Sequence, residues 1–306
     1  MEYDLLEYKP VVEEYLRDTP AVLSSHSFVS LFTWKDFFEF GFKVIDDALC
    51  IFATHEAGTF LYLPPLAKDL SPAVIDTCFA DMHERNQGRG VSRIENLDER
   101  LLPLFPTEKF FPYCKGYEYY YYRQDLAALA GNDYKSKRSS YNHFCKNYWS
   151  AYRPYSPEMQ KKCLELYDAW SNRRKEIDPD PVAVQMLEEN RSVHRLVMEH
   201  DEALEIVGRV VEVDGELKAY TFGYRLNDQT FCVVLEIADW SVQGLAVYIF
   251  REFCADVELK KYKFINVMDD FAMDEVKQTK LSFKPRSAKL TSEKDPMSSS
   301  RKGFSN

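Results

Sequence analysis

The residues best suited to chemistry lie in the last third of the chain, where carboxylates follow short apolar runs. Glu236 and Asp239 end one such run, and Asp269 and Asp270 end another. A sheet does not need carboxylates at its strand ends, whereas a pair of them in a cleft could hold an ammonium group or act as a general base. A solvated rim is the alternative, with Asp239 capping the helix that follows.

A lysine close to this acidic set could supply the complementary charge. Lys280 and Ser282 are predicted to lie on one face of a strand, with Leu281 and Phe283 on the other. Beside a cleft, Lys280 could hold a carboxylate or a phosphate. A basic edge strand that blocks aggregation would show the same pattern.

The segment Ser241–Ala246 combines a glycine with a predicted helix start. Backbone amides at a helix N-terminus can hold an anion, and Gly244 would let one approach closely. The GNAT acyltransferases use a loop of the form (Arg/Gln)-x-x-Gly-x-(Gly/Ala) for the pyrophosphate of acyl-CoA. Gly244 and Ala246 match the last two fixed positions and Ser241 departs from the first. An ordinary strand-to-helix turn is the alternative, because short glycine motifs recur by chance.

A basic and aromatic segment covers residues 134–149. On a helix, Tyr134, Arg138 and Tyr141 would share one face, so that cations could meet phosphates while aromatic rings stack on bases. An amphipathic connecting helix with a solvated basic side fits the pattern at least as well.

Length and composition limit the remaining classes of function. The 306 residues, 45% of them hydrophobic, suffice for about two domains with substantial cores. The net charge of −10 argues against a grip on nucleic acid or anionic lipid by bulk electrostatics. Seven scattered cysteines without Cys-x-x-Cys spacing indicate reduced thiols, and the absence of a signal peptide or long apolar run adds to an expected cytoplasmic location. The histidines show no metal-ligand spacing, so no metal site is expected.

Hydrophobic periodicity predicts an α+β fold. Each half of the chain shows helical material, antiparallel strands, a further helix and a closing strand, which suggests two units of similar layout. The polar tail from about residue 291 is predicted to be disordered. Helices are expected over 71–86, 124–148, 156–170, 181–200 and 242–257, a hairpin over 43–64, and strands over 117–122, 206–213, 217–225, 231–235 and 264–265.

Several of these segments together resemble the C-terminal domain family of phosphatidylglycerol lysyltransferase. The resemblance spans roughly residues 20–290. It is carried by Tyr122-Arg123-Gln124-Asp125-Leu126, Tyr134-Lys135-Ser136-Lys137-Arg138, Val213-Asp214-Gly215-Glu216-Leu217-Lys218-Ala219-Tyr220, Glu236-Ile237-Ala238-Asp239, Gly244, Asn266, Asp269-Asp270 and Lys280-Leu281-Ser282-Phe283-Lys284-Pro285.

The resemblance implies both a fold and an activity. The family is similar to Fem-type peptidyltransferases, which implies two tandem GNAT-like domains, each a mixed, mostly antiparallel sheet with flanking helices. The domains would cover residues 1–120 and 121–290, with the active cleft in the second and a disordered tail over 291–306. Characterised members move an amino acid from aminoacyl-tRNA to a lipid headgroup and carry membrane helices, which this chain lacks.

The expected function is therefore acyl or aminoacyl transfer to an amine or hydroxyl of a small molecule or lipid headgroup. The donor would be acyl-CoA or aminoacyl-tRNA, and no bound cofactor is required. Glu236, Asp270 and Lys280 are the expected catalytic residues. The expected substrate-binding residues are Asp239, Gly244, Asn266, Asp269, Ser282 and Arg138.

Two alternatives stay open at this point, a CoA-dependent N-acyltransferase and a non-catalytic binding protein that keeps the fold. The family segment Asn-Arg-Glu-Glu-Asp-Leu-Gly reads Asn266-Val267-Met268-Asp269-Asp270-Phe271-Ala272 here, without its Arg and Gly. This departure is what favours the binding protein. The oligomeric state is left undetermined.

Overall fold

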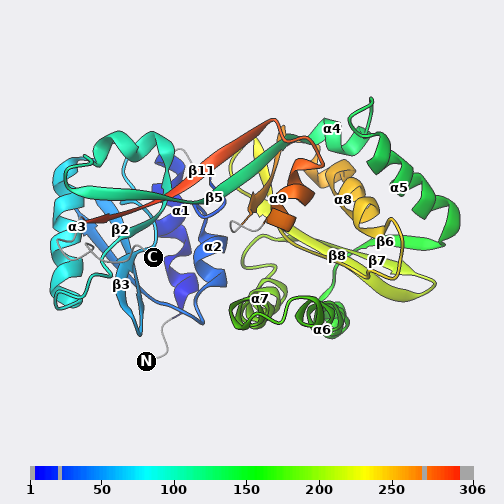
Figure 1. Cartoon of the computed structure of the whole chain (residues 1–306), viewed down its shortest axis with the longest axis horizontal. Coiled ribbons are helices and arrows are strands. Elements are labelled where there is room, and N and C mark those ends of the chain that lie inside the picture. Colours follow the sequence, from blue (N-terminus) through cyan, green and yellow to red (C-terminus); the bar gives the residue numbers. More distant parts are fainter. Residues whose placement is uncertain (1–3, 20–22, 271–273, 297–306) are drawn as a thin grey trace. The chain divides into compact units, whose positions relative to one another are not determined.

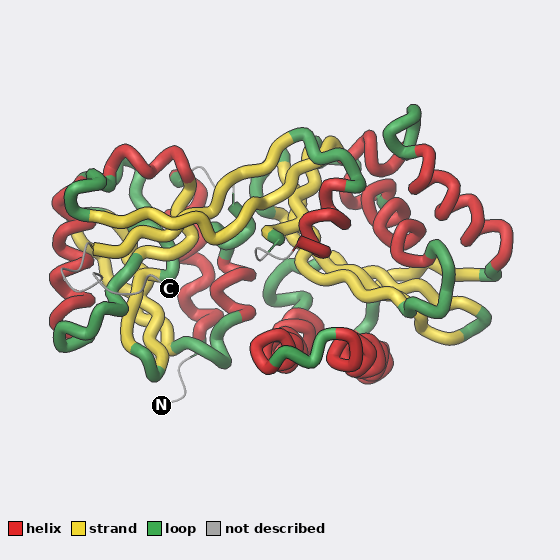
Figure 2. Tube along the Cα trace, viewed as in Figure 1, coloured by secondary structure: helices red, strands yellow, loops and turns green. Residues whose placement is uncertain are grey.

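The computed structural model describes residues 4–19, 23–270 and 274–296, and of residues 287–296 it describes the backbone alone. The described residues form two compact units (Figures 1 and 2). The first lies within Met1–Glu118, Asp269–Ala272 and Lys289–Asn306, and the second within Tyr119–Met268 and Met273–Ala288.

The first unit is a mixed sheet covered by helices on both faces. Its strands follow the order β1, β2, β3, β4 and β11; β3 and β4 are parallel, and the pairs β1–β2, β2–β3 and β4–β11 are antiparallel. Helix α3 packs on one face of the sheet, and α1 and α2 lie on the other (Figure 1). The elements are η1 (Leu5–Tyr8), α1 (Lys9–Asp18), α2 (Phe28–Thr33), β1 (Glu39–Ile45), β2 (Ala48–His55), β3 (Gly58–Leu61), α3 (Pro72–Arg85), β4 (Ile94–Asp98), η2 (Glu99–Leu104) and β11 (Ser287–Pro296). Strand β5 (Phe110–Tyr122) starts in this unit and ends in the second.

The second unit repeats this layout with longer strands. Strands β6 to β9 form an antiparallel series, and β10 is parallel to β9. Helices α6 and α7 cover one face and α5 and α8 the other (Figure 1). The elements are α4 (Arg123–Ala128), α5 (Lys135–Asn147), β6 (Ser150–Pro154), η3 (Pro157–Met159), α6 (Gln160–Ile177), α7 (Pro181–Glu199), β7 (Val207–Val213), β8 (Glu216–Arg225), β9 (Thr230–Ala238), α8 (Leu245–Ala255), η4 (Val257–Leu259), β10 (Phe264–Asp269) and α9 (Asp274–Leu281). The predicted α+β class with two similar units is thus confirmed.

Both units share an irregularity where their parallel strands separate. The pairing of β3 with β4 is limited to Leu61 and Ile94, and that of β9 with β10 ends at Cys232 and Asn266. Two positions beyond the last pair, Asn96 in β4 has φ +53° and Met268 in β10 has φ +63°. Non-glycine residues seldom adopt this left-handed region. The same kink at the same register position is independent support for two units of like construction.

The structure departs from the sequence expectations at the C-terminal end. Lys280 lies in helix α9 and not in a strand, and Ser282 follows that helix. Asp274 and Glu275 occupy the first turn of α9, where the helix dipole favours carboxylates, and a few alternating residues are too short a pattern to separate strand from helix.

The expected tail and domain boundaries differ as well. Residues 291–296 belong to β11, which pairs with β4 instead of being disordered, while 297–306 lie outside the described residues. The sequence placed 121–290 in one domain, whereas Asp269, Asp270 and the larger part of β11 group with the first unit. Main-chain pairing explains this strand, because a polar segment can complete a sheet without contributing to a core.

The first prediction concerns Gly244, which precedes α8. Its φ is +88°, and an added Cβ would lie 2.4 Å from the carbonyl oxygen of Ser140 in α5. Replacing Gly244 by Ala should lower the free energy of unfolding by about 2 kcal/mol or more, because backbone strain and a clash with main-chain atoms add. Urea denaturation measures this loss.

Gly215 provides the matched control in the same unit. Its φ is +83°, yet nothing lies within 4 Å of an added Cβ. Gly215→Ala should therefore cost only the left-handed penalty of roughly 1 kcal/mol. Equal losses in the two variants would show that contact with α5 does not require glycine at position 244.

Candidate functional site

The separation of β9 from β10 creates the candidate site of the second unit. Beyond Cys232, β9 continues without β10 beside it, and this part of β9 carries Glu236. The adjacent Leu235 and Ile237 belong to the apolar cluster under α6 and α7. Because side chains alternate along a strand, Glu236 faces the opposite side, toward α8.

Glu236 has an unusual electrostatic environment. Its Oε2 is buried without a hydrogen-bond partner among the described residues. Burial raises the pKa of the carboxyl group to about 8, against a smaller lowering by a hydrogen bond with Thr221. The charge of Glu236 in turn raises the pKa of the Cys254 thiol in α8, for which burial is the larger cause. A carboxyl group that titrates near neutral pH at a strand separation has the properties of a general acid or base.

The end of β10 is held in its kinked form by side chains. Asn266 is fully buried, and its Oδ1 accepts a hydrogen bond of 2.6 Å from the backbone N–H of Met268. The Nζ of Lys280 donates to the carbonyl oxygen of Val267 at 2.7 Å. The hydroxyl of Tyr121 donates to the carbonyl oxygen of Lys280 at 2.8 Å, which ties α9 to β5.

Lys280 and Glu236 border the same apolar cluster. Val267 packs against this cluster, which also contains Tyr119, Val233 and Cys254. The Nζ of Lys280 lies 5.9 Å from the centre of the Tyr119 ring. Glu236 and Lys280 thus border one apolar cluster, whereas Asn266, which lies between Ile265 and Val267 of this cluster, faces the other side of the sheet.

The two aspartates predicted for this site group with the first unit. Asp270 is 2% exposed, and its Oδ1 accepts a long hydrogen bond of 3.5 Å from the backbone N–H of Tyr117. One oxygen of Asp269 is buried. Phe271 and Ala272, the positions that follow, lie outside the described residues.

Three further expected binding residues are engaged with nearby backbone or side chains. Asp239 accepts hydrogen bonds from the amide and hydroxyl of Ser241 and from Lys218; partial burial raises the pKa of Asp239, but these bonds outweigh it and leave the pKa lowered. The hydroxyl of Ser282 donates to Thr279 at the end of α9. The guanidinium of Arg138 donates to the carbonyl oxygens of Leu129 and Gly131. These contacts shape turns and helix ends.

The backbone at Gly244 is closely covered by α5. In addition to the approach of the Ser140 carbonyl, the N–H of Gln243 donates to the hydroxyl of Tyr148 and the N–H of Leu245 donates to the carbonyl of Val242. These amides already have partners. The helix start therefore differs from an open anion cradle, which needs unbonded N–H groups.

The aromatic residues of the 134–149 segment largely face inward. Tyr134 is 7% exposed and belongs to the core beside α8, and the hydroxyl of Tyr141 donates to Glu252 at 2.7 Å. Trp149, by contrast, is 75% exposed. The helix is amphipathic and buries Tyr134, so that this ring offers no face to a base, and its solvated basic side agrees with the alternative interpretation.

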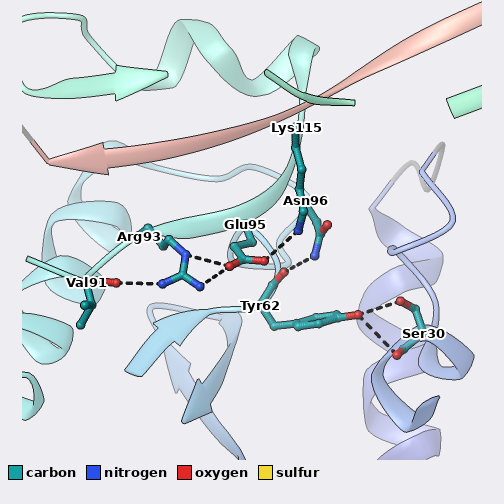
Figure 3. A network of polar contacts seen from close by, with 7 residues as sticks. All are labelled: Ser30, Tyr62, Val91, Arg93, Glu95, Asn96 and Lys115. Carbon is teal, nitrogen blue, oxygen red and sulfur yellow. Dashed lines mark hydrogen bonds and ion pairs between the residues drawn. The ribbon is translucent and has the colours of Figure 1, made fainter. Parts of the chain in front are cut away.

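In the first unit, side chains bridge the corresponding separation of β3 and β4 (Figure 3). The Nδ2 of Asn96 donates to the carbonyl oxygen of Tyr62 at 2.9 Å, and the Tyr62 hydroxyl bonds to that of Ser30 at 2.8 Å. Glu95 accepts hydrogen bonds from Arg93 and, at 3.0 Å, from Lys115. Burial alone would raise the pKa of Glu95, but the two cations lower it by more than burial raises it. The pKa is therefore below its ordinary value, and the carboxyl group is ionised.

Sequence reasoning did not select this network. Polar residues within the short strand Ile94–Asp98 were the available signal, but their partners are distant in the chain. Because Glu95 is neutralised by two cations and Asn96 joins the diverging strands, the second unit is the better candidate for chemistry.

A family model described as "Phosphatidylglycerol lysyltransferase, C-terminal" matches residues 17–290. The chain belongs to this family. The family is named for the transfer of a lysyl group to phosphatidylglycerol. No curated protein matches the chain.

Solved structures confirm the tandem GNAT-like fold. A conserved protein of unknown function from Bacteroides thetaiotaomicron has a TM-score of 0.84 at 24% identity, with 96% of this chain and 97% of that chain covered. FemX has a TM-score of 0.65 at 8% identity, with 96% of each chain covered. A tandem GNAT protein from the clavulanic acid biosynthesis pathway has a TM-score of 0.54 at 9% identity, with 98% of each covered.

No helix in the described part of this family member combines the length and apolarity needed to cross a bilayer.

The second prediction tests the state of Glu236. Its pKa is about 8 in the folded protein and 4.5 as the ordinary value, so the folded state binds more protons between these values. The wild-type protein should lose stability as the pH rises from about 5 to about 8, whereas Glu236→Gln, which cannot ionise, should not show this loss. The difference in unfolding free energy should therefore grow in favour of the variant by about 1 kcal/mol per pH unit.

Glu165, an exposed carboxylate of α6, is the control position. Denaturation curves of Glu165→Gln should run parallel to those of the wild type across the same pH range. A Glu236→Gln curve that also runs parallel would mean that Glu236 titrates like a surface carboxylate.

Proposed function

We propose that the protein transfers an aminoacyl group from a tRNA ester to an amine or hydroxyl acceptor, in the second unit. The observation that carries the proposal is Glu236, a buried carboxyl group whose pKa is raised to about 8 where β9 leaves β10. The folded protein would be more stable with an apolar residue at this position. A chemical role therefore accounts for the carboxyl group.

Glu236 would act as the general base. In its ionised form, it would take the proton of the acceptor as the acceptor attacks the carbonyl carbon of the ester. The bond to the ribose oxygen then breaks, and that oxygen regains a proton as it leaves. No covalent intermediate on the protein is required, because one acid-base group can serve both proton transfers.

Lys280 would stabilise the negative charge that develops on the carbonyl oxygen. Its ammonium group is partly buried beside the end of β10, where its Nζ is oriented by the Val267 carbonyl. A fixed positive charge in a partly desolvated site lowers the barrier more than the same charge in water. The proposal assigns the proton transfer to Glu236 and not to Asp270, because Asp270 groups with the first unit.

The start of α8 favours an aminoacyl ester over acyl-CoA as donor. The close approach of Ser140 to Gly244 and the bonded amides of Gln243 and Leu245 leave little for a pyrophosphate to bind there. A tRNA ester does not need this loop. The name of the family, which refers to lysyl transfer, supports an aminoacyl donor.

The third prediction uses isosteric and conservative variants of the proposed pair. The assay follows radiolabelled amino acid from a panel of aminoacyl-tRNAs to phosphatidylglycerol vesicles or to small amines, with acetyl-CoA as a parallel donor. Glu236→Gln should reduce transfer by about 100-fold or more, because the base is lost. Lys280→Met should reduce it by a similar factor, and Lys280→Arg should restore part of the rate because it keeps the charge.

Melting temperatures and the Glu165→Gln variant serve as controls. If activity and stability fall together in the Lys280 variants, with no rescue by Arg, Lys280 has only a structural role. Transfer from acetyl-CoA alone would assign the chain to the CoA-dependent class. Full activity of Glu236→Gln would contradict the proposed mechanism, and binding of donors without turnover in the wild type would favour a binding protein.

A further inference from the structure

A recess in the second unit lies at the opposite end of β10 from the candidate site. It has a volume of about 590 Å³ and is formed by the end of β5, the start of α4 and the loop that leads into β10. Lys263 lines it, whereas Met268 marks the kink; along an extended strand these positions are roughly 16 Å apart. The lining residues are Tyr122, Arg123, Gln124, Asp125, Lys260, Lys261, Tyr262 and Lys263.

The recess is strongly cationic. Lys260, Lys261 and Lys263 are exposed, and none of them forms an ion pair with a carboxylate in the described part of the chain. Arg123 is 8% exposed, and its guanidinium is fixed by the carbonyl oxygens of Tyr262 and Cys254, each at 3.0 Å. A buried cation thus lies beside three exposed ones.

The nearby carboxylates do not neutralise these lysines. Asp125, the acidic residue of the lining, pairs with Arg286 at 3.2 Å. Asp256 and Glu258, which precede the lysine-rich loop, both pair with Arg209, Asp256 at 2.7 Å, and Asp228 pairs with Arg225. The positive charge therefore remains available to a ligand, in a protein whose net charge is −10.

Aromatic rings stand at the edge of the recess. Tyr122 is 36% exposed and stacks on Phe264, with 5.3 Å between ring centres and an interplanar angle of 24°. The Nζ of Lys263 lies 5.1 Å from the centre of the Phe264 ring, and the guanidinium of Arg286 lies 5.2 Å from the centre of the Tyr122 ring. Rings and a guanidinium plane of this kind provide stacking surfaces for a nucleobase.

We propose that this recess binds the phosphate groups of a nucleotide, with the Tyr122–Phe264 pair beside its base. The lysines supply the point charges that bind phosphate, and the volume falls in the range of about 300–1,000 Å³ typical of small-molecule sites. A free nucleotide and a nucleotide within an RNA strand share this chemistry. The site lies at the other end of β10 from the candidate transfer site. A single nucleotide bound there is independent of the transfer chemistry, whereas an RNA strand bound there rests on the proposed tRNA donor.

Titration calorimetry with three probes tests the site, using inorganic pyrophosphate, ADP and an uncharged tRNA. The charge-reversal double variant Lys261→Glu/Lys263→Glu alters two exposed side chains and should fold normally. We expect at least about a tenfold loss of affinity for each probe that binds the wild type, and a smaller dependence of binding on salt concentration.

The double variant Lys161→Glu/Lys162→Glu is the matched control, because it changes the net charge equally at two exposed lysines of α6. Binding of ADP that the Lys261→Glu/Lys263→Glu variant weakens shows that a single nucleotide suffices. Binding of tRNA that this variant weakens, in the absence of ADP binding, identifies an RNA strand as the source; both results support the proposal. The proposal is overturned if no probe binds at about 1 mM, or if the control variant loses as much affinity as the test variant.

Discussion

The early end of main-chain pairing between parallel strands determines the rest of this structure. Once β9 and β10 stop exchanging hydrogen bonds after Cys232 and Asn266, their remaining backbone and side-chain polar groups need other partners. The amide of Asn266 satisfies one of them by bonding to Met268, and Lys280 satisfies another by bonding to Val267. The left-handed conformation of Met268 is thus stabilised by its neighbours, and polar side chains are required where a sheet would otherwise continue.

The two units solve the same geometric problem in different ways. In the first unit, the side chain of Asn96 donates a hydrogen bond to the carbonyl oxygen of Tyr62, and the nearby Glu95 accepts hydrogen bonds from Arg93 and Lys115. All of these groups satisfy one another, which makes the network rigid. In the second, the side chain of Asn266 bonds within its own strand, and Glu236 has no cation against it among the contacts described. One unit therefore has the character of a support and the other that of a reactive site.

The sequence predicts local structure well here because the local signals are strong. Ser71 caps α3 and Pro72 begins it, within the helix predicted over 71–86. Asp214-Gly215, with φ values of 52° and 83°, turns between the strands predicted over 206–213 and 217–225. Partners distant in the chain are less accessible. The sequence shows that Arg138 is basic, but not that its guanidinium donates hydrogen bonds to the carbonyl oxygens of Leu129 and Gly131.

The candidate site shows the same limit. The position of Glu236 at the end of an apolar run makes it a candidate. Its burial, however, depends on where β9 stops pairing with β10, a strand that follows helix α8 in the sequence. Lys280 was predicted to lie in a strand and lies in helix α9, because four alternating residues fit both periods. Tyr119 and Tyr121 gave no functional signal, since a run of tyrosines in a strand is equally typical of a core.

The contrast between Glu95 and Glu236 is the strongest argument that the second unit carries the function. Both are carboxylates on strands of a parallel pair, and burial raises the pKa of each. Arg93 and Lys115 reverse this effect at Glu95, so that its charge stabilises the fold. At Glu236 no cation opposes the rise in pKa that burial causes, among the contacts described. The folded protein is therefore less stable at neutral pH than it would be with an uncharged side chain. Proteins depart from local stability chiefly at functional sites, and a carboxyl group that titrates close to neutral pH is what proton transfer to and from an acceptor requires.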